Sequence, residues 1–146
     1  MTELKEAVRL KPDYAEAHIG LGVTYLALER YQESIPEFKE AIRLDPNNDE
    51  AHFGLGVAYY KLGRTPEAIA EYKEVIRLDH PNNAAAHFGL GWAYDGLKDG
   101  GNAILHLAEA ERLYEKNNDV SILADVRKFL RGYYAKYGYR PEDFAK

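Results

Sequence analysis

A nine-residue segment occurs three times in this chain at nearly constant spacing. The copies read AHIGLGVTY at 17–25, AHFGLGVAY at 51–59 and AHFGLGWAY at 86–94, in steps of 34 and 35 residues. Self-similarity at a period of roughly 20–50 residues is typical of stacked-repeat proteins, in which each unit buries its apolar face against the next. The segment therefore predicts a repeat architecture and a role in binding.

Amphipathic helical patterns surround each copy, and short breaks rich in Pro, Gly and Asn separate them. We expect helices over residues 2–10, 13–28, 31–44, 49–62, 66–78, 83–97, 102–114 and 119–137. The break at 80–83 is one residue longer than usual, which accounts for the second step of 35. Gly63 suits a left-handed helix end, and Pro66 suits a first helical turn. No stretch has the period of a strand, so the predicted class is all-α.

The pattern within each copy resembles the tetratricopeptide repeat family. That family carries a bulky residue, Leu-Gly and an aromatic on its first helix, then a small residue, an aromatic and a final Pro on its second. The first-helix positions here are His18, Leu21, Gly22 and Tyr25; His52, Leu55, Gly56 and Tyr59; and His87, Leu90, Gly91 and Tyr94. The second-helix positions are Ser34, Phe38, Ala41 and Pro46; Ala68, Tyr72, Val75 and Pro81; and Ala103, Leu107 and Ala110, without a final Pro. Histidine stands where the family usually has Trp.

The resemblance implies a right-handed α-solenoid of stacked antiparallel helix pairs, in one domain over 1–138 with a flexible tail over 139–146. Its predicted parts are a half-repeat at 1–12, repeats at 13–46, 47–81 and 82–115, and a capping helix at 119–137. The half-repeat is in phase with the second helices, so the chain either begins with a degenerate cap or is a piece of a longer array. We favour the piece, because Leu4 and Val8 otherwise lack a partner helix.

Each first helix has two apolar faces. One carries His52, Leu55, Gly56 and Tyr59 at i, i+3, i+4 and i+7, and we assign it to the core, where the glycine lets the partner helix approach closely. The other corresponds, by the resemblance, to the concave groove in which the family docks peptides. The predicted groove residues are Ile19, Val23, Leu26, Phe53, Val57, Tyr60, Phe88 and Trp92, with Lys61 and Asp95 at the rim and Gly20, Gly54 and Gly89 beside them. The alternative is that part of this face is core between repeats.

The last predicted helix is amphipathic. Its apolar side carries Ile122, Val126, Phe129, Leu130, Tyr133 and Tyr137. We expect it to cap the open end of the third pair, as terminal units of solenoids must. The alternative is that it lies in a groove, either its own or that of a neighbouring copy.

The predicted function is non-catalytic recognition of a protein or peptide through this groove. The alternatives are a self-association module, in which the half-repeat or last helix pairs with another copy, and a regulatory segment of a larger protein. Family members that clamp the acidic C-terminus of heat-shock chaperones use Lys, Asn or Arg at groove positions. The matching positions here are Ile19, Val23, Gly54, Ala85 and Gly89, none of which can pair with a carboxylate. That co-chaperone activity is therefore not expected.

Composition excludes several other classes of function. A net charge of −5 without a basic cluster disfavours nucleic acid, and the absence of cysteine excludes disulfides and thiolate metal sites. No apolar run approaches a membrane span and the N-terminus has no signal-peptide pattern, so a cytoplasmic location is expected.

Metal and catalytic sites are not expected either. His18, His52 and His87 lie on successive helices about 10 Å apart by the family geometry, too far to share one ion. His106 has no His or carboxylate at a convincing ligand spacing, and no nucleophile has an evident base beside it. We therefore predict no metal, no cofactor and no enzymatic activity.

Overall fold

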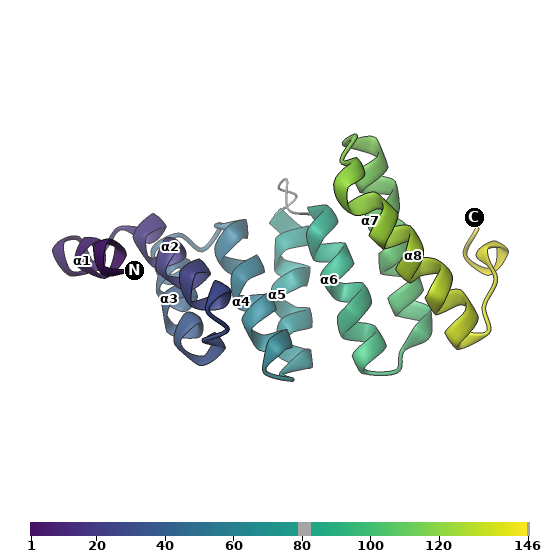
Figure 1. The fold of residues 1–146 in the computed structure, drawn as a ribbon, viewed down its shortest axis with the longest axis horizontal. Coiled ribbons are helices and arrows are strands. Elements are labelled where there is room, and N and C mark those ends of the chain that lie inside the picture. The colour runs from purple at the N-terminus through teal and green to yellow at the C-terminus, as the bar shows by residue number, and fades with distance from the viewer. Residues whose placement is uncertain (79–82, 146) are drawn as a thin grey trace. The chain divides into compact units, whose positions relative to one another are not determined.

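The computed structural model describes residues 1–78 and 83–145, in which all regular structure is helical (Figure 1). The helices are α1 (Thr2–Leu10), α2 (Ala15–Ala27), α3 (Tyr31–Leu44), α4 (Asp49–Lys61), α5 (Thr65–Leu78), α6 (Asn83–Gly96), α7 (Gly100–Lys116), α8 (Val120–Tyr137) and the 3₁₀ helix η1 (Pro141–Phe144). The all-α prediction is confirmed. Of the predicted break at 80–83, all but Asn83 lies outside the described residues. None of the described helices is both long and apolar enough to cross a membrane.

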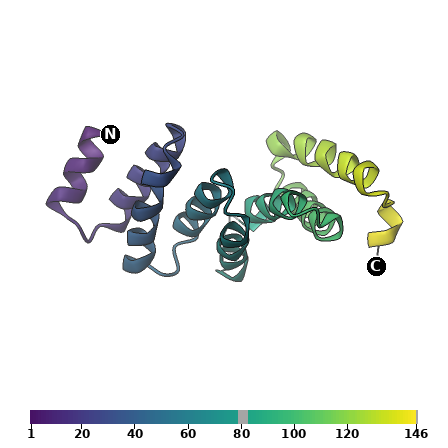
Figure 2. The ribbon, with the colours of Figure 1, turned by 90° about the horizontal axis from the view of Figure 1, so that it is seen from below.

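Contacts group the chain into two compact units, Met1–His80 and Pro81–Lys146, so the predicted domain over 1–138 spans both. In the first unit, α2 pairs with α3 and α4 with α5, while α3 packs on α4 and α1 on α2 (Figures 1 and 2). Short connections between successive helices make the pairs antiparallel. Each helix therefore covers the next one along the chain, as in a stack of repeats.

The second unit contains one further pair, α6 with α7, and α8 lies against α7. Leu123 and Val126 of α8 share one buried cluster with Ala110 and Tyr114 of α7. Leu130 joins a second buried cluster that contains further apolar side chains of α7. Helix α8 thus buries an apolar face of α7.

The Leu-Gly pair that recurs in each repeat is explained by the close packing of the two helices of each pair. A Cβ atom added to Gly22 would lie 2.9 Å from the ring of Phe38, and one added to Gly56 would lie 2.8 Å from the ring of Tyr72. The third pair repeats this arrangement, since a Cβ on Gly91 would lie 2.6 Å from Leu107. The predicted close approach of partner helices at these glycines is confirmed.

Gly54, which the sequence places beside the predicted groove, packs against the preceding helix pair. It is buried, and an added Cβ would lie 2.3 Å from Cζ of Phe38, which belongs to that pair. Gly54 therefore admits the ring of Phe38 between α2 and α4. The equivalent Gly20 faces a methyl group of Leu4 at 3.1 Å, so α1 packs on α2 as α3 packs on α4.

The turn inside each helix pair uses a left-handed residue at an equivalent position. Gly63 has φ +73°, as predicted, but Glu29 (φ 57°) and Lys98 (φ 60°) adopt the same conformation without being glycine. The turn geometry inside each pair is thus repeated even where the sequence has no glycine.

Asn48 caps α4 by accepting a hydrogen bond from the backbone N–H of Ala51.

Residues 139–146, for which the sequence predicts a flexible tail, include η1. The backbone N–H of Arg140 donates to the Asp143 carboxylate at 2.8 Å, which fixes the start of this short helix. Phe144 then contacts the rings of Tyr134 and Tyr139, with centroids 6.0 and 5.2 Å apart. Aromatic contacts therefore hold the segment against the end of α8.

Candidate functional site

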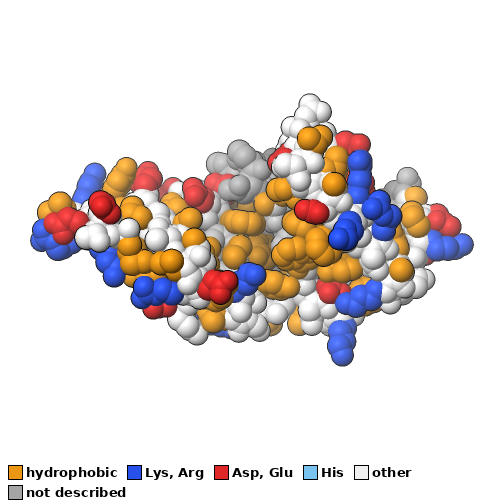
Figure 3. All heavy atoms as spheres, viewed as in Figure 1, with side chains coloured by type: hydrophobic (Ala, Val, Ile, Leu, Met, Phe, Trp, Pro, Cys, Tyr) orange, Lys and Arg blue, Asp and Glu red, His pale blue; other side chains and the backbone are white. Residues whose placement is uncertain are grey.

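The predicted groove residues of the first unit differ in exposure. Ile19 is only 5% exposed and belongs to the core, whereas Val23, one turn further along α2, is 44% exposed. Leu26, Phe53, Val57 and Tyr60 are half-buried, and Lys61 is exposed. Figure 3 shows orange hydrophobic side chains at the surface over α4. Part of the predicted groove face therefore belongs to the core, as the alternative interpretation of the sequence allowed. The other part leaves apolar side chains exposed to solvent.

In the second unit, helix α8 contributes to the face that the sequence assigned to α6 alone. Phe88 and Trp92 are half-buried with ring centroids 4.8 Å apart. Phe129 of α8 packs on both, at 5.9 Å from Phe88 and edge-on at 5.4 Å from Trp92. Phe129 keeps 37% of its surface exposed. The three rings form an aromatic cluster, and sequence reasoning placed Phe129 on the apolar side of α8 without linking it to α6.

Asp95, predicted at the groove rim, is bound within the chain. Its carboxylate accepts hydrogen bonds from Lys136 Nζ at 2.5 Å and from the Tyr137 hydroxyl at 2.6 Å, both on α8. Burial opposes ionisation of Asp95, but these hydrogen bonds and the positive charge of Lys136 together outweigh it and lower the pKa of the carboxyl group. Asp95 therefore ties α6 to α8.

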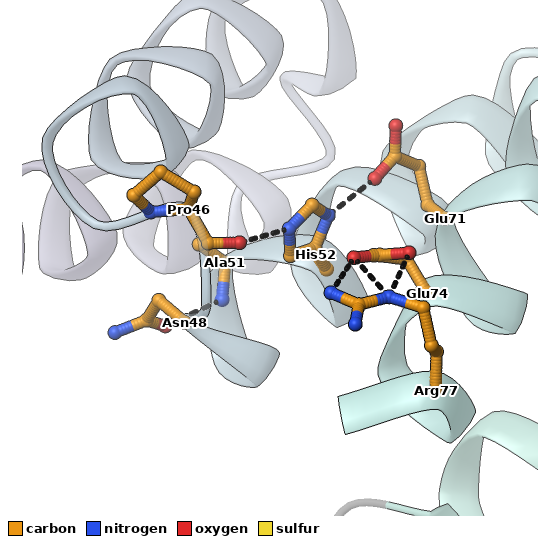
Figure 4. Close-up of polar contacts among 7 residues, drawn as sticks. All are labelled: Pro46, Asn48, Ala51, His52, Glu71, Glu74 and Arg77. Atoms are coloured by element: carbon orange, nitrogen blue, oxygen red, sulfur yellow. Dashed lines mark hydrogen bonds and ion pairs between the residues drawn. The ribbon is translucent and has the colours of Figure 1, made fainter. Parts of the chain in front are cut away.

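The first two repeated histidines use one ring nitrogen to contact the following helix and the other to contact the preceding loop. His52 Nδ1 lies 2.7 Å from Oε2 of Glu71 on α5, and Nε2 donates to the Pro46 carbonyl at 2.9 Å (Figure 4). His18 makes the same pair of contacts, with Glu37 and the Pro12 carbonyl, at the same distances. Because a carbonyl and a carboxylate both accept hydrogen bonds, this arrangement is satisfied best when the imidazole carries two protons. The histidines thus replace the family's Trp with a polar link.

The glutamates of α3 and α5 have two kinds of partner. Glu40 and Glu74 pair with Arg43 and Arg77 on the same helix. Glu37 and Glu71 bind the histidines of the preceding helix. A fixed spacing of 19 residues between each histidine and its glutamate was the available signal.

The third copy breaks this pattern, because the residue 19 positions after His87 is His106. The two Nδ1 atoms lie 2.9 Å apart, and burial lowers the pKa of His87. The sequence showed no His or carboxylate at a ligand spacing from His106, and it is the packing of α6 on α7 that brings the two rings together. Within residues 1–78 and 83–145, no group of three or more His, Asp or Glu side chains is placed to hold a metal ion.

The His52 link gives a pH-dependent stability. The hydrogen bond to Glu71 raises the pKa of His52 against the effect of burial, with smaller contributions from the Pro46 carbonyl and Glu74. A raised folded-state pKa means that the stabilisation is complete below the unfolded pKa of about 6.5 and is lost as pH rises through the folded pKa. We expect the melting temperature to fall as pH rises above about 6.5, and less steeply in His52→Gln.

NMR titration of the His52 ring tests the same cause directly. Its midpoint should lie above the ordinary value of about 6.5, and Glu71→Gln should bring it down. A wild-type midpoint at or below that value would contradict the link.

Comparisons with known proteins place the chain in a family. A TPR repeat model matches residues 24–63, and a tetratricopeptide repeat model matches residues 53–118. Together the matches span residues 24–118, well over half of the chain. A search of the curated proteins found no match.

Several solved structures share the fold. MamA is 29% identical with a TM-score of 0.69, and the match covers 78% of this chain and 65% of the MamA chain, so this chain spans less than two thirds of that MamA chain. The TPR2B domain of yeast Sti1 in its pHsp70 complex is 21% identical, with a TM-score of 0.78 and coverage of 84% and 97%. PcrH in complex with the chaperone binding region of PopD is 20% identical, with a TM-score of 0.80 and coverage of 87% and 96%. The repeated Leu-Gly packing, the helix pairs and the matched family models lead to one assignment: this chain belongs to the tetratricopeptide repeat family.

Proposed function

We propose that this chain is a non-catalytic protein-interaction module that binds an apolar or amphipathic peptide segment of a partner. The observation that carries the proposal is the exposure of apolar and aromatic side chains on the first helices of the pairs. Val23 is 44% exposed, Phe53 and Val57 of α4 are half-buried, and Phe88 and Trp92 of α6 are half-buried beside Phe129. Family membership and the peptide complexes of Sti1 and PcrH support this use of the fold.

The chemistry of the surface favours apolar segments over acidic tails. Ile19 is buried, and Val23 and Gly54 offer no group that pairs with a carboxylate. Asp95 is already engaged by Lys136 and Tyr137, so it is not an open rim charge. The exposed Lys61 remains as a cation at the end of α4 that can orient a partner. The partner is therefore expected to contribute apolar side chains flanked by few charges.

The expected affinity for a peptide follows from the apolar surface area that the peptide can cover. Exposed apolar surface on the order of 400 Å² yields on the order of 10 kcal/mol when covered. Association costs several kcal/mol in lost translational and rotational freedom, so dissociation constants in the micromolar range follow.

Selection from a random peptide library on the wild-type chain tests this function. Enriched peptides should be rich in apolar and aromatic residues and bind with micromolar affinity by fluorescence polarisation. Val57→Glu introduces a charge on the half-buried face of α4 and should weaken binding about 10-fold or more, since an unpaired charge against apolar groups is costly. Lys39→Glu, at an exposed position of α3, is the matched control and should leave binding unchanged.

Equal binding by wild type and Val57→Glu would overturn the proposal, as would selected peptides without an apolar bias. Sedimentation equilibrium across a wide concentration range distinguishes the alternative of self-association. A monomer at every concentration is expected, because binding to an outside peptide requires a free face. A mass rising toward that of a dimer, lowered again by Val57→Glu, would assign the apolar face to a second copy instead.

A further inference from the structure

The His87–His106 pair differs from the other two histidine links in its chemistry. The rings, on α6 and α7, have centroids 5.0 Å apart and Nδ1 atoms 2.9 Å apart. The ring of Tyr94 stacks parallel to His106, with an interplanar angle of 2° and centroids 5.5 Å apart. Packing therefore holds two imidazoles with their Nδ1 atoms directed toward one another.

A contact between two imidazole nitrogens at this distance holds a single proton. One Nδ1 donates it, and the other must present a lone pair. In the second copy the second group is a glutamate, whose hydrogen bond raises the pKa of His52. In the third copy the partner is a second imidazole, so one of the two Nδ1 atoms presents a lone pair of the kind that binds metal ions.

The separation fits two ligands of one metal ion. Zinc–nitrogen bonds of about 2.0–2.1 Å place two ligand nitrogens roughly 3.3 Å apart in a tetrahedral site, a few tenths of an ångström more than the 2.9 Å found here. At a right angle, as in the tetragonal sites of Cu²⁺ and Ni²⁺, the same bonds place the nitrogens roughly 2.9 Å apart. The two lone pairs now point at one another, so each ring must turn by roughly 35–45° for both to converge on an ion beside the line that joins the nitrogens.

The surroundings leave room for water ligands. His87 and His106 line an open pocket of about 540 Å³ together with Glu109, Arg112 and Phe144. Glu109 is hydrogen-bonded to Arg112, at 2.9 Å from Nε and 2.5 Å from Nη2, so the two charges balance and Glu109 is not a free ligand. Solvent can therefore fill the remaining coordination positions of an ion held by two histidines.

We propose that Nδ1 of His87 and Nδ1 of His106 bind one divalent transition-metal ion in place of the proton they share. The ion joins α6 to α7, as the glutamates join the helices of the first two pairs. Two protein ligands completed by water give an affinity in the micromolar range, far below that of a structural site with four protein ligands. The site is independent of peptide binding by the apolar faces.

Isothermal titration calorimetry of the full chain with Zn²⁺, and separately with Ni²⁺, tests the site at pH 7.5. We expect one ion per chain with a dissociation constant on the order of 1–100 µM, and a melting temperature that rises with ion concentration. Affinity should fall about 10-fold or more at pH 6, because protons compete for the imidazole nitrogens.

Two substitutions of His106 separate binding from folding. His106→Gln should weaken binding of both ions at least 10-fold. His106→Glu recreates the histidine–glutamate pair of the other copies, so it should fold, with a circular dichroism spectrum like that of wild type. It should also weaken ion binding at least 10-fold, because the carboxylate then engages His87 Nδ1 as Glu71 engages His52. His52→Gln is the matched control, since His52 is engaged by Glu71 and Pro46, and it should leave ion binding unchanged.

Absence of saturable binding below about 1 mM for both ions in the wild-type chain would overturn the proposal. Unchanged affinity in a folded His106→Gln protein would also overturn it, because the ion would then be held elsewhere.

Discussion

Phe38→Ala is expected to lower the free energy of unfolding by about 3–5 kcal/mol, the usual cost of truncating a buried aromatic side chain. The Phe38 side chain is fully buried, and its ring occupies the space left by two glycines, Gly22 of its own pair and Gly54 of the next. Truncation removes the contact between two repeats as well as the contact within one. The helices cannot collapse fully into the cavity, because other core side chains hold them apart. Urea denaturation followed by circular dichroism measures the change.

Phe53→Ala is the control for Phe38→Ala. It removes the same side chain from a half-buried position against Tyr72, where the ring centroids lie 5.7 Å apart. The expected loss is about half as large or less, because less apolar surface is re-exposed and solvent fills the space. Equal losses in the two variants would show that Phe38 does not have the linking role inferred from its packing.

Gly54→Ala should destabilise the chain by about 2–3 kcal/mol, although alanine is the better helix former. The added methyl group would lie 2.3 Å from Cζ of Phe38 and 2.5 Å from Cε1, far inside van der Waals contact. The buried ring cannot swing away without displacing α2 or α4, so the strain falls on the backbone packing. Thermal and urea unfolding both measure the loss.

Gly20→Ala is the matched substitution at the equivalent position of the first copy. Its methyl group would meet Cδ2 of Leu4 at 3.1 Å, and Leu4 is a half-buried side chain that can rotate. The gain in helix propensity of roughly 0.8–1 kcal/mol is then expected to outweigh the contact, leaving the protein as stable as wild type or more so. A loss as large as that of Gly54→Ala would contradict this difference.

The helices themselves were predictable from the sequence. The expected bounds of α1 and α3 agree with the structure, and those of α2, α4 and α6 differ by one or two residues at their ends. Helix α7 begins two residues before the predicted start, because Asp99 caps it by accepting a hydrogen bond from the N–H of Asn102. Local signals such as apolar period, Pro and caps determine these features, and each acts within a few residues.

The groove was predictable only in part. Ile19 and Val23 lie on the same stripe of α2, yet one is core and the other 44% exposed, because exposure depends on which neighbouring helix covers each turn. The role of Phe129 and the engagement of Asp95 depend on where α8 lies, and no local pattern records that position. The contact of His106 with His87 depends in the same way on the packing of α6 against α7.

The sequence by itself determined the repeat, its period, the helical class and the glycines at which helices approach closely, because these follow from spacings that recur three times. The tertiary structure alone decided which apolar side chains remain exposed, that α8 covers part of the α6 face, and that the third histidine faces another histidine. These features are contacts between side chains of different helices. The packing of the helices sets the distances between such side chains, and local helix propensity does not determine them.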